Sequence, residues 1–409
     1  MAPLPTDTDG RRLPRISPVD SEGAFCKPVL LRRKRFIRRL QLHFAALFVC
    51  GAFLAVGQPP EKVIIGYIYS PNRPLVPSDV AAEKLTHINY AFANIKDGLM
   101  VEGYAGDPEN YRTLNNLKER NPKLKILVSV GGWTWSGGFS DMVLTPQSRK
   151  RFIDSAVALL ERHRLDGLDV DWEYPGQKGL NNTNRPEDKV NCTAFLAEAR
   201  AALDKAGKAA GKRYLLTMAT GTNNSWIEHT EMDKVHASLD FVNLMTYDMA
   251  GDWDPVTAHH SPLFTNPASL KGQSCARSVD LFIAAGVPAS KIVLGAPFYG
   301  KAWGEVPPAD NGLHQPGKRV TVKLGTNFRE IKANLEGKDG FVRYWDDTSK
   351  APFLYNAENR IFISYEDEQS IGLKGSYVKE RGLAGIMFWE YNGDSEGKLL
   401  DAINRALRP

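Results

Sequence analysis

Eight short runs of β-branched and aromatic residues alternate with longer helical patterns along residues 58–409. Strands that alternate with helices over this length indicate an α/β fold, a (β/α)8 TIM barrel in which helices surround a closed parallel sheet. The predicted strands are 62–68, 86–93, 125–130, 167–171, 214–219, 241–246, 291–296 and 384–389. The clearest helical patterns are 146–164, 193–206, 274–285 and 397–407, the first with an apolar stripe at helical spacing.

The interval between the seventh and eighth predicted strands breaks this alternation. It contains short aromatic runs at 341–345, 353–355 and 361–365, each bounded by Gly, Asp or Asn. Such runs are typical of short strands joined by turns. We therefore expect a small α+β subdomain, residues 302–383, inserted into a catalytic barrel domain that spans 58–409.

The fourth predicted strand carries three acids, Asp169, Asp171 and Glu173, which alternate with apolar residues. Because successive side chains of a strand point to opposite faces, the three carboxylates share one face. Alternation of this kind more often marks a half-exposed strand. However, acidic residues are generally depleted in strands, and like charges on one face of a strand repel one another. A half-exposed strand therefore fits this segment poorly. Crowded carboxylates shift one another's pKa and can keep one protonated near neutral pH, so we interpret this strand as catalytic.

Active groups of such barrels lie at the carboxyl ends of the strands and on the loops that follow. Nearly every predicted strand ends in an aromatic or acidic residue, and although each alone is better explained by core packing, together they predict a cleft. An acid cluster ringed by Tyr and Trp suits sugar rings. A phosphate-binding loop is not indicated, because Gly131-Gly132 is followed by Trp133. The strand ends in question are 66–69, 129–133, 169–173, 245–248, 297–299 and 387–389.

The acids have the spacing Asp-x-x-Asp-x-Asp-x-Glu over residues 166–173. Ser-Val-Gly-Gly at 129–132, Met-Thr-Tyr-Asp at 245–248 and the late Trp389 accompany it. With these motifs in order, the chain resembles a glycoside hydrolase family 18 chitinase from residue 62 to 407, insertion included. The resemblance implies an enzyme that hydrolyses β-1,4 linkages between N-acetylglucosamine units of chitin or chitooligosaccharides, without a cofactor. No metal-ligand spacing is visible.

The resemblance also implies residue roles. Glu173 would be the general acid that protonates the glycosidic oxygen, and the acetamido oxygen of the substrate would be the nucleophile of a retaining mechanism. Asp171 would orient the N-acetyl group and share a proton with Asp169. Tyr247 would hydrogen-bond the acetamido group. The residues expected to bind the sugars are Tyr67, Phe92, Trp133, Met245, Asp248, Trp253, Tyr299 and Trp389.

Other functions fit parts of the pattern. An endo-β-N-acetylglucosaminidase that acts on glycoproteins or on wall glycan would share the fold, and so would a non-catalytic chitin-binding lectin. The presence of Glu173 with its partner acids disfavours the lectin. Lys301 stands where many relatives carry Arg. A lysine cannot make the two parallel hydrogen bonds that an arginine makes, so we expect this difference to reshape one sugar subsite. The sequence leaves open whether cleavage is endo or exo.

Residues 1–57 are predicted to form an N-terminal leader. A basic cluster at 32–39 precedes an apolar run at 40–57, and small residues at 55–57 suit cleavage before Gln58. We expect a secreted protein. The alternative is a membrane anchor formed by residues 40–57, which are just long enough to span a bilayer.

The leader also accounts for the positive charge of the chain. Ten of the 52 Lys and Arg residues and four of the 47 acids lie in it, so the net charge of +5 becomes −1 beyond residue 57. A nucleic-acid partner is therefore not expected. We expect the protein to be a monomer. Cys192 and Cys275 remain after the leader, and in an exported protein they either pair or stay as independent buried thiols.

Overall fold

A computed structural model describes residues 61–408, and within this range eight parallel strands close into a barrel. The barrel strands are β1 (Val63–Tyr69), β2 (His87–Lys96), β4 (Lys125–Gly131), β5 (Gly167–Asp171), β6 (Leu215–Thr220), β7 (Phe241–Leu244), β8 (Ile292–Pro297) and β14 (Gly385–Trp389). Each pairs in parallel with the next, and β14 returns to pair with β1. The predicted (β/α)8 TIM barrel is confirmed.

Three details of the barrel differ from the predicted strands, and the first is that β2 runs to Lys96, three residues beyond its predicted end. β7 stops at Leu244, short of the predicted end at Thr246, because the backbone turns tightly there: the Thr246 N–H donates to the Leu244 carbonyl at 2.8 Å. This turn directs the following residues toward the barrel mouth. A short strand that the sequence did not indicate, β3 (Leu99–Val101), pairs antiparallel with the end of β2.

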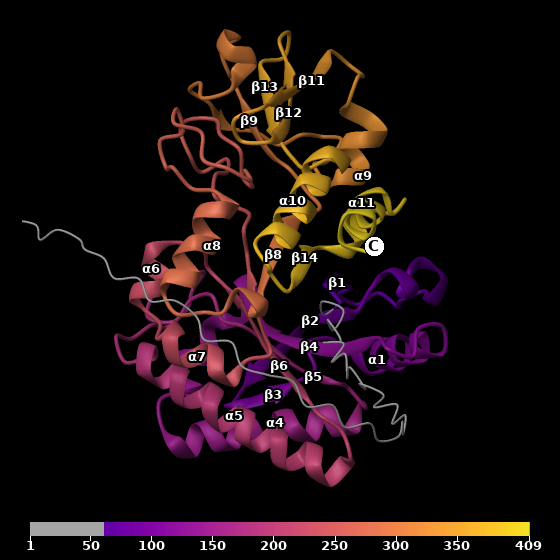
Figure 1. Ribbon diagram of the computed structural model, residues 1–409, viewed down its shortest axis with the longest axis vertical. Coiled ribbons are helices and arrows are strands. Elements are labelled where there is room, and N and C mark those ends of the chain that lie inside the picture. The colour runs from indigo at the N-terminus through magenta and orange to yellow at the C-terminus, as the bar shows by residue number, and fades with distance from the viewer. Residues whose placement is uncertain (1–60, 409) are drawn as a thin grey trace, which may run out of the picture. The chain divides into compact units, whose positions relative to one another are not determined.

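Helices cover the outside of the barrel (Figure 1). In α4 (Pro146–Arg162) the Thr145 side chain accepts from the Ser148 N–H in a capping box, and Pro146 stands at the first position, where no N–H is needed. Its apolar stripe is buried in the main core. The other α-helices of the barrel domain, of which α2 and α6 lie at its mouth, are α1 (Asp107–Asn116), α2 (Gly132–Trp135), α3 (Phe139–Met142), α5 (Asp188–Ala210), α6 (Asn224–Glu228), α7 (Met232–Ser238), α8 (Cys275–Ala284), α10 (Glu368–Glu380) and α11 (Lys398–Leu407).

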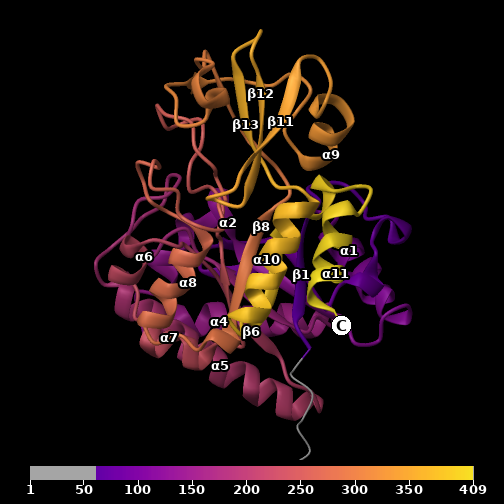
Figure 2. The same cartoon turned by 45° about the horizontal axis from the view of Figure 1, so that its top comes forward.

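A second, antiparallel sheet lies between β8 and α10 along the chain, with the strand order β10-β9-β13-β12-β11. Its elements are β9 (Lys301–Gly304), β10 (Lys318–Arg319), β11 (Phe341–Asp346), β12 (Ala351–Asn356) and β13 (Ile361–Ser364), with the short α9 (Phe328–Glu330). Figures 1 and 2 show this sheet as a layer of its own beyond the barrel. It has its own aromatic core around Trp303, Phe353 and Phe362.

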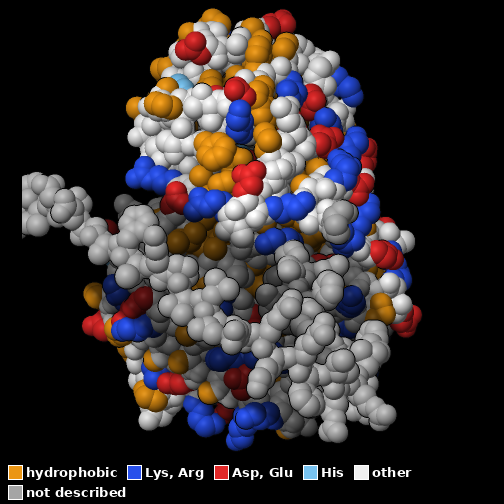
Figure 3. All heavy atoms as spheres, in the orientation of Figure 1, with side chains coloured by type: hydrophobic (Ala, Val, Ile, Leu, Met, Phe, Trp, Pro, Cys, Tyr) orange, Lys and Arg blue, Asp and Glu red, His pale blue; other side chains and the backbone are white. Residues whose placement is uncertain are grey.

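The helix α10 falls inside the predicted subdomain range of 302–383, yet it contacts α11 and β14 of the barrel layer. We therefore propose that the inserted unit is Lys301–Ser364 and that α10 completes the barrel. On the face shown in Figure 3, acidic and basic side chains are interspersed over the inserted sheet.

The two cysteines beyond the leader are unpaired. Cys192 on α5 and Cys275 on α8 are buried and free, so they are independent core side chains. The predicted leader, residues 1–57, lies outside the described residues. Between residues 61 and 408, no helix is both long and apolar enough to cross a membrane.

Candidate active site

The strand β5 delivers its acids into the barrel mouth. Asp169 and Asp171 are buried and face inward, while Leu168, Val170 and Trp172 belong to the core outside the barrel. The alternation expected from the sequence is therefore present. It separates the carboxylates from the apolar side chains of the same strand. Asp171 and Glu173 can therefore line a cavity at the barrel mouth, and Asp169 lies below them.

Asp169 lies inside the barrel and accepts hydrogen bonds from four side chains. Burial raises the pKa of Asp169 above its usual value, and the hydrogen bonds that it accepts offset only part of this rise. No hydrogen bond joins Asp169 to Asp171 within the described residues, so the sharing of a proton between them stays a prediction. The four donors are Thr217 Oγ1 at 2.5 Å, Ser129 Oγ at 2.7 Å, Tyr67 OH at 2.9 Å and Asn243 Nδ2 at 3.2 Å.

Tyr67 differs from the expectation that it contacts substrate. It is only 1% exposed, does not line the cavity, and uses its hydroxyl to hold Asp169. Tyr69, two positions further along the same face of β1, lines the cavity instead. The two tyrosines lie in successive layers of the barrel, and only the outer layer reaches the mouth.

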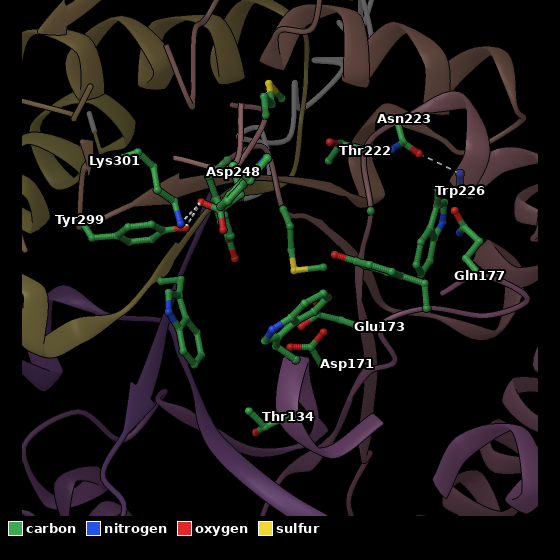
Figure 4. Close-up of a pocket in the computed structure, with 18 of the residues that line it drawn as sticks. Thr134, Asp171, Glu173, Gln177, Thr222, Asn223, Trp226, Asp248, Tyr299 and Lys301 are labelled. Carbon is green, nitrogen blue, oxygen red and sulfur yellow. Dashed lines mark hydrogen bonds and ion pairs between the residues drawn. The ribbon is translucent and has the colours of Figure 1, made fainter. Parts of the chain in front are cut away.

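Asp171 and Glu173 line the cavity itself and lie together near its centre in Figure 4. Asp171 Oδ1 is buried and has no hydrogen-bond partner among the described residues. Burial raises the pKa of Asp171 well above its usual range, and the charge of Glu173 adds to this.

The pKa of Glu173 is raised to about 7, chiefly by burial. Interaction with the Tyr174 hydroxyl lowers this pKa, and the negative charge of Asp248 raises it. A carboxyl group with this pKa holds its proton in a useful fraction of molecules near neutral pH, as a general acid requires.

Two residues that were not expected to act in the site fix the backbone that carries the acids. Ser136 Oγ accepts from the Glu173 N–H at 2.8 Å and donates to the Gly132 carbonyl at 2.9 Å. Gly131 has φ of 104°, and a Cβ there would lie 2.3 Å from the Asp171 carbonyl oxygen. A side chain cannot fit, so the glycine is required for β4 to approach the end of β5.

Tyr247 lies on the wall formed by the loop after β7. Its hydroxyl is 4.0 Å from Met387 Sδ, its only hydrogen-bond partner among residues 61–408. Burial raises the pKa of Tyr247 well above its usual range, and the charge of Asp171 adds to this, so the hydroxyl keeps its proton. A neutral hydroxyl donor near a carboxyl group with a free oxygen is a suitable pair for holding an amide.

Asp248 is the centre of a second polar group on this wall (Figure 4). Tyr299 OH donates to Asp248 Oδ1 at 2.7 Å, Lys301 Nζ lies 3.2 Å from the same oxygen, and His260 Nδ1 lies 3.6 Å from it. Burial pushes the pKa of Asp248 upward, but His260, Lys301 and Tyr299 together hold it below its usual range. Lys301 therefore places a single positive charge within reach of Asp248.

The acids open into a cavity of about 910 Å³ with aromatic walls. Phe92 stacks on Trp389 with 5.4 Å between ring centroids, and Trp133 and Trp253 are 48% and 51% exposed. Contiguous exposed apolar surface within a concave site is typical of ligand-binding grooves. Apart from Tyr67, every residue expected to bind sugars lines this cavity: Phe92, Trp133, Met245, Asp248, Trp253, Tyr299 and Trp389.

Several cavity residues were missed by the sequence analysis. Tyr174 follows Glu173 directly, and this position could have been noticed. The others lie on loops, on the short helices α2 and α6 or on the inserted sheet, where no motif marks them. They include Tyr104, Thr134, Trp135, Gln177, Thr222, Asn223, Trp226, Asp252, Gln273 and Arg319.

Comparison with known proteins decides the family. Residues 63–394 match the sequence profile described as Glycosyl hydrolases family 18. The chain belongs to this family. It is 40% identical over 389 residues to chitinase A1 of Niallia circulans, an alignment that covers 81% of this chain and 56% of that protein. The chain thus spans little more than half of this relative.

Solved structures of family 18 proteins agree with this assignment. A family 18 N-acetylglucosaminidase from Paenibacillus barengoltzii is 42% identical, with a TM-score of 0.77 over 85% of this chain and all of that one. Chitinase ChiA74 from Bacillus thuringiensis is 34% identical, with a TM-score of 0.79 over 85% of this chain and 70% of that one. No cluster of three or more potential metal ligands is found in the described part of this family 18 protein.

Proposed function

We propose that this protein is a chitinase that hydrolyses β-1,4 linkages between N-acetylglucosamine units. The observation that carries the proposal is Glu173, whose pKa is raised to about 7 at the centre of an aromatic cavity. Relatives named as chitinases, at 40% and 34% identity, support the substrate class. The whole chain is shorter than the first of these, so the assignment concerns the domain that they share.

In the proposed reaction Glu173 donates its proton to the glycosidic oxygen, and the acetamido oxygen of the same sugar attacks the anomeric carbon. The bond to the leaving sugar breaks, and a cyclic oxazolinium ion forms. The ionised Glu173 then takes a proton from water, whose oxygen attacks the anomeric carbon from the vacated side. The bond between that carbon and the acetamido oxygen breaks at the same time, and this restores the acetamido group. The two inversions retain the configuration, as in substrate-assisted glycosidases.

Asp171 and Tyr247 would hold the acetamido group during this reaction. The free Oδ1 of Asp171 would accept from the amide N–H, which becomes more acidic as the ring closes. The Tyr247 hydroxyl would donate to the acetamido oxygen and direct it toward the anomeric carbon. Asp169, fixed by its four donors, would act as a structural support for Asp171 from below. Asp248 would bind the sugar beside the scissile bond.

A panel of substrates tests the proposal. The purified protein is incubated with an N-acetylglucosamine hexamer, a high-mannose glycoprotein and bacterial wall glycan, and the products are separated by mass. We expect cleavage of the hexamer alone. Release of an intact glycan from the glycoprotein, without cleavage of the hexamer, would identify an endo-β-N-acetylglucosaminidase instead.

A second candidate is stepwise release of single sugars, because one similar structure at 42% identity is titled an N-acetylglucosaminidase. The same hexamer digestion separates the two modes. Early accumulation of dimers and trimers supports internal cleavage, and early accumulation of monomer and pentamer supports release from one end.

We further propose that residues 1–57 direct export and are then removed. In a secreting host the full chain should appear outside the cytoplasm with an N-terminus near Gln58. Arg at both Phe48 and Leu54 should keep it inside, because a mid-segment charge costs roughly 2.5–3.5 kcal/mol per residue on insertion. A mature form that keeps residues 40–57 and sediments with membranes would support the anchor.

A further inference from the structure

Part of the cavity wall is built jointly by the barrel and the inserted sheet. The turn 251–254 comes from the loop after β7, and Arg319 comes from β10, an edge strand that pairs with β9. Asp252, Trp253 and Arg319 line the same cavity as Glu173. Substrate that extends beyond the acids would therefore meet a residue of the inserted unit.

Trp253 is presented on a turn with little freedom to move. The Gly251 N–H donates to Asp254 Oδ2 at 3.0 Å, and a Cβ on Gly251 would lie 2.4 Å from the Trp253 ring. Asp254 also pairs with Lys271 at 2.7 Å, and its carbonyl accepts from Trp303 Nε1 at 3.0 Å. The exposed Trp253 ring is thus a preorganised platform.

Arg319 stands beside this platform with unused donors. Its Nε lies 2.7 Å from Asp252 Oδ2, and neither terminal nitrogen makes a hydrogen bond within residues 61–408. The guanidinium group is planar, always charged and presents five N–H donors. The ion pair with Asp252 restricts the guanidinium while leaving its outer donors free. Gln273, which lines the same cavity, adds an amide.

We propose that Arg319, oriented by Asp252, forms a distal sugar-binding subsite next to Trp253 and makes the enzyme prefer long chains. The inference rests on the proposed function. A sugar that stacks on Trp253 presents its hydroxyl and acetamido oxygens at the ring edge, and these oxygens are acceptors for the guanidinium donors. Since β10 belongs to the inserted sheet, the insertion would contribute directly to recognition of chain length.

The test compares Arg319→Ala with Lys318→Ala. Lys318 is the other residue of β10, has nearly the same exposure (72% against 71%), and pairs with Glu305 away from the cavity. The readout is the ratio of kcat/KM for the N-acetylglucosamine hexamer to kcat/KM for a chromogenic chitobioside. We expect Arg319→Ala to lower this ratio about threefold to tenfold through KM, the effect of one partly exposed charge-assisted hydrogen bond. Lys318→Ala should keep the original ratio.

Asp252→Asn distinguishes direct contact from support of the turn. It breaks the ion pair but keeps the guanidinium, so we expect a smaller loss than in Arg319→Ala. Equal losses in the two variants would show that Arg319 only holds the Trp253 turn, and an unchanged ratio in Arg319→Ala would also overturn the proposal. If the unaltered protein cleaves neither substrate, the proposed function fails, and binding of the hexamer to Glu173→Gln and to Glu173→Gln with Arg319→Ala still tests the subsite.

Discussion

Replacing Tyr174 with Phe should move the alkaline limb of the activity profile to higher pH. The Tyr174 hydroxyl interacts with the Glu173 carboxyl group and favours its ionised form, against the burial that raises the pKa of Glu173 to about 7. Because the general acid acts in its protonated form, kcat/KM of the unaltered protein should fall as the pH rises through about 7. Without the hydroxyl, ionisation becomes harder and the fall should begin later.

The size of the shift follows from the strength of one hydrogen bond to a charged group. Such a bond contributes about 1.5 kcal/mol, and one pKa unit corresponds to about 1.4 kcal/mol, so the limb should move by about one pH unit. The assay is kcat/KM for an N-acetylglucosamine tetramer, measured by chromatography across the pH range. Tyr104→Phe is the control, since its hydroxyl lies in the same cavity and contacts Tyr69 at 3.1 Å. A limb that stays in place or moves to lower pH would refute this reasoning.

Three further predictions concern the mechanism, the platform and the core. Fully deacetylated oligomers should not be cleaved, because they lack the nucleophilic acetamido oxygen, and cleavage at comparable rates would show that a protein group attacks. Gly251→Ala should raise KM for the hexamer by displacing the Trp253 ring, and an unchanged KM would contradict the crowding at this position. Lys374→Met should lower the free energy of unfolding in urea by about 3–5 kcal/mol, because it leaves Glu366 buried without its partner at 2.6 Å. Adding Glu366→Gln to this variant should recover part of the lost free energy. A Lys374→Met variant as stable as the unaltered protein would contradict the prediction.

The sequence predicted the fold well because barrel strands and covering helices leave strong local patterns. The strand 167–171 was predicted with the bounds that β5 has, since its alternation of acids and apolar residues reports directly which face is buried. The family and the α/β barrel are confirmed. The roles of Glu173, Asp171 and Asp169 remain proposals that the cavity geometry supports.

What the sequence could not show depends on contacts between distant segments. Tyr67 and Tyr69 share a face of β1, and only the register with neighbouring strands decides which one reaches the mouth. Ser136 holds the Glu173 backbone from a different loop, and Arg319 reaches the cavity from the inserted sheet. Neither contact leaves a local pattern. The effect of Lys301 on its subsite also remains a prediction.

The central claim is that Glu173 supplies the proton for cleavage of N-acetylglucosamine polymers. Its most direct test is a single preparation of Glu173→Gln, in which hexamer hydrolysis and hexamer binding are both measured against the unaltered protein. Turnover should fall by a factor on the order of 10² or more, the scale of a lost general acid, while the dissociation constant stays nearly the same. Hydrolysis at close to the original rate would contradict the assignment of Glu173 as the acid.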